Sequence, residues 1–162
     1  SMPLQPPKKN KREEVLAVAA IHTSSHWLMI KRPKTGLLAN QWEFPSVCVW
    51  CSTNSTKNDV PIVKVDKRNE ALNSFLRELV SEELVTAERH IHKSSIEHVF
   101  SHVRHTMWLE HTKVSNESYD QPFVSSNREV RWMSEDDMKN VGVTSGVKKI
   151  LKVLRQKIVK SR

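Results

Sequence analysis

Residues 32–45 read RPKTGLLANQWEFP and link two short apolar segments, the second of which begins within the stretch at Trp42. The segment before them, Trp27–Lys31, is typical of a β-strand. Pro33 ends this strand, because proline has no N–H to donate to a neighbouring strand. The apolar segment Trp42–Trp50 predicts a further strand, which we expect to be interrupted at Pro45 for the same reason. We therefore expect residues 32–45 to join two strands of one sheet.

Apolar spacing outside this region predicts the other elements. The first two strands are expected to join near Ser24 and Ser25, a longer helix to begin at Asp66 as its N-cap, and a short helix to begin at Ser134. The predicted strands are Val15–Ile21, Trp27–Lys31, Trp42–Trp50, Ile96–Phe100, Val103–Val114 and Val130–Met133, the helices are Lys67–Leu84, Glu135–Lys139 and Thr144–Lys160, and the polar loops are Ser52–Asp59 and Ser115–Asn127. This order predicts a mixed sheet covered by helices on both faces.

Length and composition restrict the classes of protein. The 162 residues suffice for one domain, with a mean hydropathy of −0.53 and no apolar run near the ~20 residues that span a bilayer. Three glycines at unsuitable spacings exclude the dinucleotide fingerprint and the Walker loop. Ser1 before Met2 resembles the remnant of a cleaved tag, and the proline-rich, basic residues that follow predict a disordered connector over 1–14. We place the folded domain at residues 15–160.

Charge is concentrated at the carboxyl end. The net charge is +8, and residues 139–162 contain eight basic and no acidic residues. In the last predicted helix, an apolar stripe lies opposite the basic residues. The stripe comprises Val147, Ile150, Leu151, Leu154 and Ile158. A basic surface of this kind attracts polyanions such as nucleic acid, although a solvated helix face has the same composition.

Residues 77–85, RELVSEELV, resemble the helical half of a Nudix box, where an arginine and several glutamates hold magnesium against a pyrophosphate. Glu78 and Glu82 are four residues apart and share a helix face. The resemblance implies glutamates at the positions of Ser81 and Asn69, and it implies glycines at two further positions. Those two positions are occupied by Leu84 and Val63. Because cation affinity depends on the number of carboxylates, we expect a structural helix with an exposed acidic face, not a hydrolase.

Residues 32–45 closely resemble R-P-x-x-G-L-L-A-x-x-W-E-F-P in the C-terminal domain of MutY-type adenine DNA glycosylases. Residues 98–102, HVFSH, look like the Phe-Ser-His loop of that family, and the segments at 131–133 and 143–149 are similar to its closing strand and last helix. The resemblance implies a Nudix-like fold of α/β (α+β) class, a mixed β-sheet sandwiched between helices. In this family that domain recognises 8-oxoguanine on the strand opposite adenine, in base excision repair.

The resemblance also implies what this sequence does not contain. The family's catalytic acid and iron–sulfur cluster belong to an N-terminal helical domain, and a four-cysteine cluster cannot be built from Cys48 and Cys51. We therefore expect a fragment that is not an enzyme by itself, with no cofactor and no bound metal. The parent would be an adenine DNA glycosylase of the nucleus, or alternatively of the mitochondrion. Two cysteines and no signal peptide favour a reducing compartment.

Phe100, Ser101 and His102 are the expected lesion-binding residues. Oxidation at C8 of guanine places a proton on N7, so that an acceptor becomes a donor, and the Ser101 hydroxyl could accept from it. Phe100 could wedge beside the base stack and His102 could reach a phosphate. Further expected phosphate contacts are Arg104, Lys148, Lys149 and Lys152. The alternative is a core phenylalanine followed by an ordinary turn serine.

Other functions remain as alternatives. The spacing of Cys48 and Cys51 resembles half of a zinc site, and six of the eight histidines lie between positions 90 and 111, but a structural zinc needs four ligands. A free-standing Nudix pyrophosphohydrolase would act on oxidised nucleotides. A protein-interaction domain would bind a checkpoint or replication clamp through the connector upstream. The expected partners are duplex DNA with an 8-oxoguanine:adenine mispair and the catalytic domain, with no membrane and a monomeric state.

Overall fold

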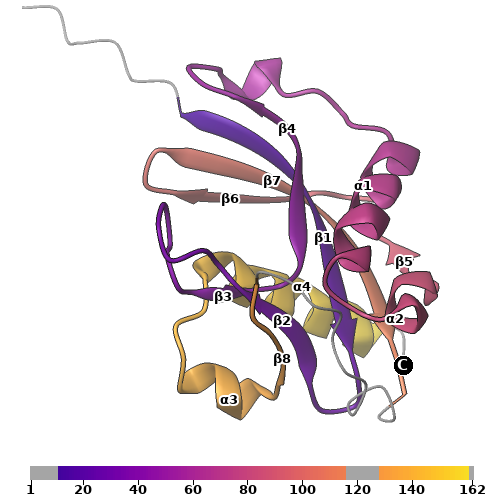
Figure 1. The fold of residues 1–162 in the computed structure, drawn as a ribbon. Helices are drawn as coiled ribbons and strands as arrows, with labels where there is room; N and C mark the ends of the chain where they lie inside the picture. The colour runs from indigo at the N-terminus through magenta and orange to yellow at the C-terminus, as the bar shows by residue number, and fades with distance from the viewer. Residues whose placement is uncertain (1–10, 116–127, 161–162) are drawn as a thin grey trace, which may run out of the picture.

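The computed structural model describes residues 11–115 and 128–160, with side chains up to residue 157, and shows a mixed eight-stranded sheet with helices on both faces (Figure 1). Its centre consists of two long parallel strands, β1 (Arg12–His22) and β7 (Val103–Lys113). They pair in register from Arg12 opposite Val103 to His22 opposite Lys113. All other strand pairs of the sheet are antiparallel.

Shorter strands extend the sheet from these two. The strand β1 pairs with β2 and β4, β2 pairs with β3 and β8, and β7 pairs with β5 and β6. Their bounds are Trp27–Lys31 for β2, Trp42–Glu43 for β3, Ser46–Ser52 for β4, His90–Ile91 for β5, Ile96–Phe100 for β6 and Val130–Met133 for β8. A short 3-10 helix, η1 (Lys57–Asp59), follows β4. The β6–β7 turn therefore lies at the end of the sheet where β1 and β7 begin.

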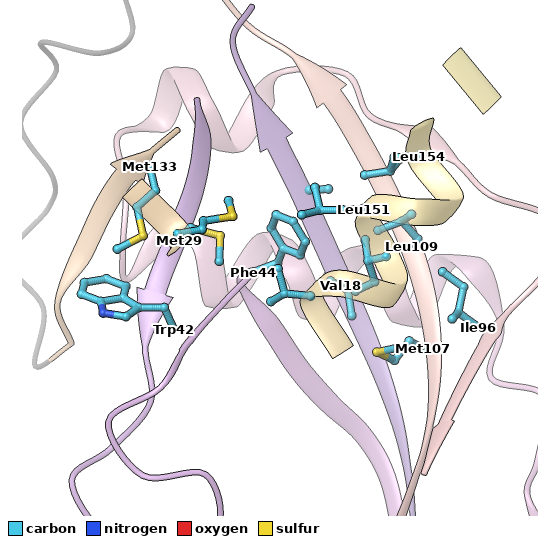
Figure 2. Packing of buried hydrophobic residues seen from close by; sticks show 14 residues of the cluster. Val18, Met29, Trp42, Phe44, Ile96, Met107, Leu109, Met133, Leu151 and Leu154 are labelled. Atoms are coloured by element: carbon cyan, nitrogen blue, oxygen red, sulfur yellow. The ribbon is translucent and has the colours of Figure 1, made fainter. Parts of the chain in front are cut away.

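Two apolar cores cover the two faces. Ala17, Ala19 and Ile21 of β1 pack beneath α1 (Val65–Arg77) and α2 (Glu82–Thr86). The alternate residues, such as Val18, face α4 (Ser145–Lys160), and Met138 of α3 (Glu135–Lys139) joins this second core. Figure 2 shows Val18, Phe44 and Met107 directed towards the side on which Leu151 and Leu154 of α4 lie. The expected α+β architecture, a mixed sheet between helices, is confirmed.

Several local predictions are also confirmed. The strand after residue 41 breaks at Phe44 and Pro45 into β3 and β4. The Ser134 hydroxyl caps α3 by accepting from the Asp137 N–H at 3.0 Å. The stripe of α4 is buried at Val147, Ile150, Leu151 and Leu154. The predicted loop Ser115–Asn127 falls almost wholly outside the described residues, and so does the side chain of Ile158. No helix in the described ranges combines the length and apolarity needed to span a bilayer.

Three predictions are wrong. The helix expected over Lys67–Leu84 is two helices, because the chain turns after Arg77 and becomes extended at Ser81, the N-cap of α2 with ψ 154°. Leu79 and Val80 keep the apolar spacing but are buried in the turn itself. Asp66 is not the N-cap of α1, which is Lys64. The first strand begins at Arg12, so residues 12–14 belong to the sheet and not to the connector.

Candidate functional site

The β6–β7 hairpin brings the three predicted lesion-binding residues together at one end of the sheet. Phe100 is the last residue of β6, and Ser101 and His102 form the exposed turn. Ser101 has a left-handed φ of 50°, which a residue with a side chain adopts only at some cost. The turn is held by the start of β1, since the Arg12 N–H donates to the His102 carbonyl at 2.8 Å and Lys11 Nζ donates to the Ser101 carbonyl at 3.4 Å.

Phe100 is fixed by two imidazole rings. Its ring stacks on His98 with centroids 5.7 Å apart and meets the edge of His105 at 4.8 Å. The side chain is half-buried and lines a cavity between the sheet and the start of α4. Phe100 therefore forms a wall behind the turn, whereas Ser101 and His102 form its exposed tip.

A row of polar side chains crosses the sheet next to Phe100. Glu14 lies opposite His105 in the β1–β7 pairing, and His105 lies opposite His98 in the β6–β7 pairing. His105 Nε2 lies 2.9 Å from Glu14 Oε1, and His98 Nε2 lies 2.7 Å from the Ser145 hydroxyl. The hydrogen bond from His105 lowers the pKa of Glu14 to about 2, while burial opposes the shift. Partial burial, followed by the charge of Lys149, lowers the pKa of His98.

Residues 32–45 enclose the other side of this cavity. Three of them, Gly36, Leu38 and Asn40, have positive φ angles, so the loop turns tightly. Arg32 NH1 holds both carboxylate oxygens of Glu43, at 2.8 and 3.2 Å. The cavity that remains has about 40 Å³, and a water needs roughly 10–15 Å³ on this measure, so it admits a few waters and no nucleotide.

Sequence reasoning gave no role to Glu14, Arg32, Glu43 or Ser145. Arg32 and Glu43 lie inside the quoted stretch, so their opposite charges were a usable signal. Glu14 offered none, because its partner His105 is 91 positions away.

Residues 77–85, which resemble a Nudix box, run from the end of α1 through a turn into α2, so Glu78 and Glu82 do not share one helix face as expected. Asn69 of α1, at a further position of that pattern, has a structural role in this fold. Asn69, which stands where the family has a glutamate, donates to Glu110 Oε1 at 2.9 Å. Glu110 also pairs with Arg89 at 3.1 Å, and both side chains are 3% exposed. This network joins α1 to β7. Glu78, Glu82 and Glu83 are exposed, and across the described residues no three His, Cys, Asp or Glu side chains are arranged to hold a metal ion.

The expected phosphate contacts lie on two different faces. Lys148, Lys149 and Lys152 are exposed on α4, and Lys149 also donates to the Glu97 carbonyl of β6. Arg104 lies on the α1 face of the sheet, where its Nε is 2.9 Å from a carboxylate oxygen of Glu13. Glu13 is 1% exposed, so Arg104 balances a buried charge. The structure therefore groups the three lysines and separates Arg104 from them.

A model of the NUDIX domain matches residues 17–153. The adenine DNA glycosylase of Rattus norvegicus is 26% identical over 129 residues, which cover 80% of this chain and 22% of that protein. The adenine DNA glycosylase of Homo sapiens is 24% identical over 157 residues, which cover 94% of this chain and 26% of that protein. The chain thus spans about a quarter of the length of these curated relatives.

Solved structures show the same fold. The C-terminal domain of mouse MUTYH, solved in complex with human PCNA, superposes with a TM-score of 0.62 at 18% identity and covers 89% of this chain and 88% of that one. The NUDIX domain of Shewanella oneidensis NrtR, solved with ADP ribose, has a TM-score of 0.62 at 12% identity, covering 95% of this chain and 94% of that one. At these identities the likeness concerns the fold alone.

Proposed function

The chain belongs to the NUDIX domain family, and from this premise we propose that it recognises 8-oxoguanine opposite adenine in DNA. It would do so as the C-terminal module of an adenine DNA glycosylase. One observation carries the proposal: Ser101 and His102 project from a hairpin whose backbone is fixed by β1. A side chain that distinguishes two bases by one edge must be polar, exposed and carried on a backbone held in a fixed position.

The chemistry of the Ser101 hydroxyl fits the altered base. Ser101 is exposed, so its hydroxyl is accessible to a ligand. The N7–H of 8-oxoguanine needs an acceptor, whereas N7 of guanine needs a donor. A hydroxyl can serve either, so a preference for the oxidised base requires that the bound DNA and the turn together hold the Ser101 hydroxyl as an acceptor. A base contact of this kind discriminates by about 1–3 kcal/mol.

The residues at the Nudix-box positions support a module that is not catalytic by itself. The Nudix-box carboxylates are dispersed, and Asn69 is used in the α1–β7 network. The iron–sulfur cluster and the catalytic acid would belong to the N-terminal domain of the parent glycosylase, with which this module would act as a monomer. Such a protein would work in the nucleus, or alternatively in the mitochondrion.

Lys148 and Lys152 would contact DNA phosphates. The related mouse domain was solved with PCNA, which supports a clamp as a further partner.

The decisive experiment is a titration with two duplexes that differ only in 8-oxoguanine or guanine opposite adenine, followed by amide chemical shifts. We expect residues 100–102 to shift at lower concentrations of the 8-oxoguanine duplex. Ser101→Gly removes the hydroxyl but accommodates φ of 50°, and Ser101→Ala removes it with the strain retained. Both variants should lose about ten-fold in preference, which corresponds to roughly 1.4 kcal/mol.

Ser94→Ala is the matched control, since Ser94 is an exposed serine in the turn before β6. It should keep the preference. Equal binding of both duplexes by the unaltered protein, or a preference unchanged in both Ser101 variants, would contradict the proposal.

A further inference from the structure

The two cysteines lie where β4 departs from regular pairing with β1. Cys51 is opposite Glu14, Trp50 is opposite Val15, and Cys48 is opposite Leu16. Val49 is therefore an extra residue without a partner, as in a β-bulge. Residues three apart in a regular strand point to opposite faces of the sheet. The bulge removes this difference and places both cysteines on one face.

That face is the one that Glu14 and Leu16 share, and both cysteines are exposed residues there, although the Cys48 thiol itself is partly buried. Val47 and Val49 instead pack against the core beneath α1. The partners of the two cysteines are two residues apart in β1, which is about 6.4–6.8 Å along that strand, so we expect the Cα atoms of the two cysteines at about this separation. This separation lies at the upper end of the range of about 4.4–6.8 Å that a disulfide spans.

The two side chains already interact. Cys48 Sγ donates to the Trp50 carbonyl at 3.3 Å. Partial burial raises the pKa of Cys48 to about 11, and the Glu14 carboxylate and the Cys51 thiol add to the shift. Cys48 is thus protonated at neutral pH, and Glu14 and Cys51 are the nearby groups that help to keep its proton bound.

We propose that Cys48 and Cys51 form a reversible intrachain disulfide by exchange with a low-molecular-weight disulfide such as oxidised glutathione. The Cys51 sulfur attacks one glutathione sulfur and forms a mixed disulfide, releasing one glutathione thiol that takes the proton from Cys51. The Cys48 sulfur then attacks the Cys51 sulfur and releases the second glutathione thiol, which takes the proton from Cys48. Two protein thiols are oxidised by two electrons, and one glutathione disulfide is reduced.

The position of the two cysteines favours a reversible disulfide over one that stabilises the fold. The closed ring contains four residues, 48–51, so it removes little entropy from the unfolded chain. An exposed disulfide is open to attack by glutathione, which makes it labile. Cys51 also lies opposite Glu14, which binds His105, so the modification would occur in the polar row beside Phe100. This inference does not depend on the proposed function.

The test equilibrates the whole chain with a series of ratios of oxidised to reduced glutathione, followed by acid quenching, alkylation of free thiols and intact mass measurement. We expect a single transition from two alkylated thiols to none, with loss of two hydrogens, in a monomer. Reduced glutathione should reverse it. Cys48→Ser should instead stop at the mixed disulfide on Cys51. The amide resonance of Glu14 should shift with the transition.

The matched control combines Cys48→Ser with Val49→Cys, which moves one thiol to the opposite face of the same strand. It should accumulate mixed disulfides without forming the ring. The inference is overturned if the native pair keeps two free thiols or ends as two mixed disulfides across the series. It is also overturned if only bonds between chains form, or if the control pair closes as readily.

Discussion

The carboxylate of Glu14 in β1 accepts a hydrogen bond from the imidazole of His105 in β7 at 2.9 Å, across the two central parallel strands. His105 in turn meets the ring of Phe100 edge-on. A contact between two distant parts of the sequence thus supports the wall behind the exposed turn.

This pair predicts how stability depends on pH. The pKa of Glu14 is about 2 in the folded chain against an ordinary value of 4.5, so its contribution is complete above pH 4.5 and is lost as the pH falls towards 2. Glu14→Gln should lower the free energy of unfolding by about 1–2 kcal/mol at pH 7, after allowance for solvent screening. The difference from the unaltered protein should shrink below pH 4.5 in urea titrations. Glu70→Gln, at an exposed site on α1, should show no such effect.

A second pH effect comes from the far end of the sheet. His92 Nε2 lies 2.6 Å from His111 Nδ1, and burial lowers the pKa of each to about 4 from 6.5. The unfolded chain therefore binds protons first, and stability should be full above pH 6.5 and fall as the pH drops from 6.5 towards 4. His111→Asn should flatten this slope in thermal unfolding between those values. A slope as steep as that of the unaltered protein would contradict the role of the pair.

Replacing Asn69 tests the α1 position at which a Nudix box would have a glutamate. Asn69→Glu would place a second carboxylate against buried Glu110, so we expect a loss of about 2–4 kcal/mol in the free energy of unfolding. Magnesium and an 8-oxo nucleoside triphosphate should give no pyrophosphate release with either protein. Asn69→Ala is the control for loss of the amide and should lose about 1–3 kcal/mol, because one donor to Glu110 disappears without a second carboxylate being added. Turnover by the unaltered protein would favour a free-standing hydrolase.

The lysines of α4 should contribute to DNA affinity without reading the base. Lys148→Gln and Lys152→Gln should each reduce the slope of log K against log salt by roughly 0.9, if each contacts one phosphate of a duplex. The loss should be equal for 8-oxoguanine and guanine duplexes. Lys139→Gln is the matched control, because Lys139 is an exposed lysine on α3 that already pairs with Asp136. An unchanged slope in both α4 variants would leave that face without a role in DNA binding.

Arg104 should behave differently from those lysines. Its partner Glu13 is buried, so Arg104→Gln should leave an uncompensated carboxylate and lower stability by about 3 kcal/mol or more. We expect a lower unfolding midpoint and an unchanged salt slope for DNA binding. A reduced slope with intact stability would instead restore the phosphate contact predicted from the sequence.

Local chemistry was readable from the amino-acid sequence alone. The break at Pro45 follows from a missing N–H, the cap at Ser134 from a hydroxyl before a helix, and the buried stripe of α4 from helical periodicity. Each depends on residues within a few positions of one another. The stretch at 32–45 indicated the Nudix-like fold through its resemblance to the C-terminal domain of MutY-type adenine DNA glycosylases.

Tertiary structure decided what depends on contacts between residues far apart in the sequence. Leu79 and Val80 satisfy a helical pattern, yet they are buried in a turn because the core beneath α1 and α2 accepts them there. Arg104 faces Glu13 and not the α4 lysines, because successive residues of β7 alternate between the two faces. Glu14 meets His105 only because two strands 91 positions apart run parallel in one register. Local spacing carries no information about pairing across such distances.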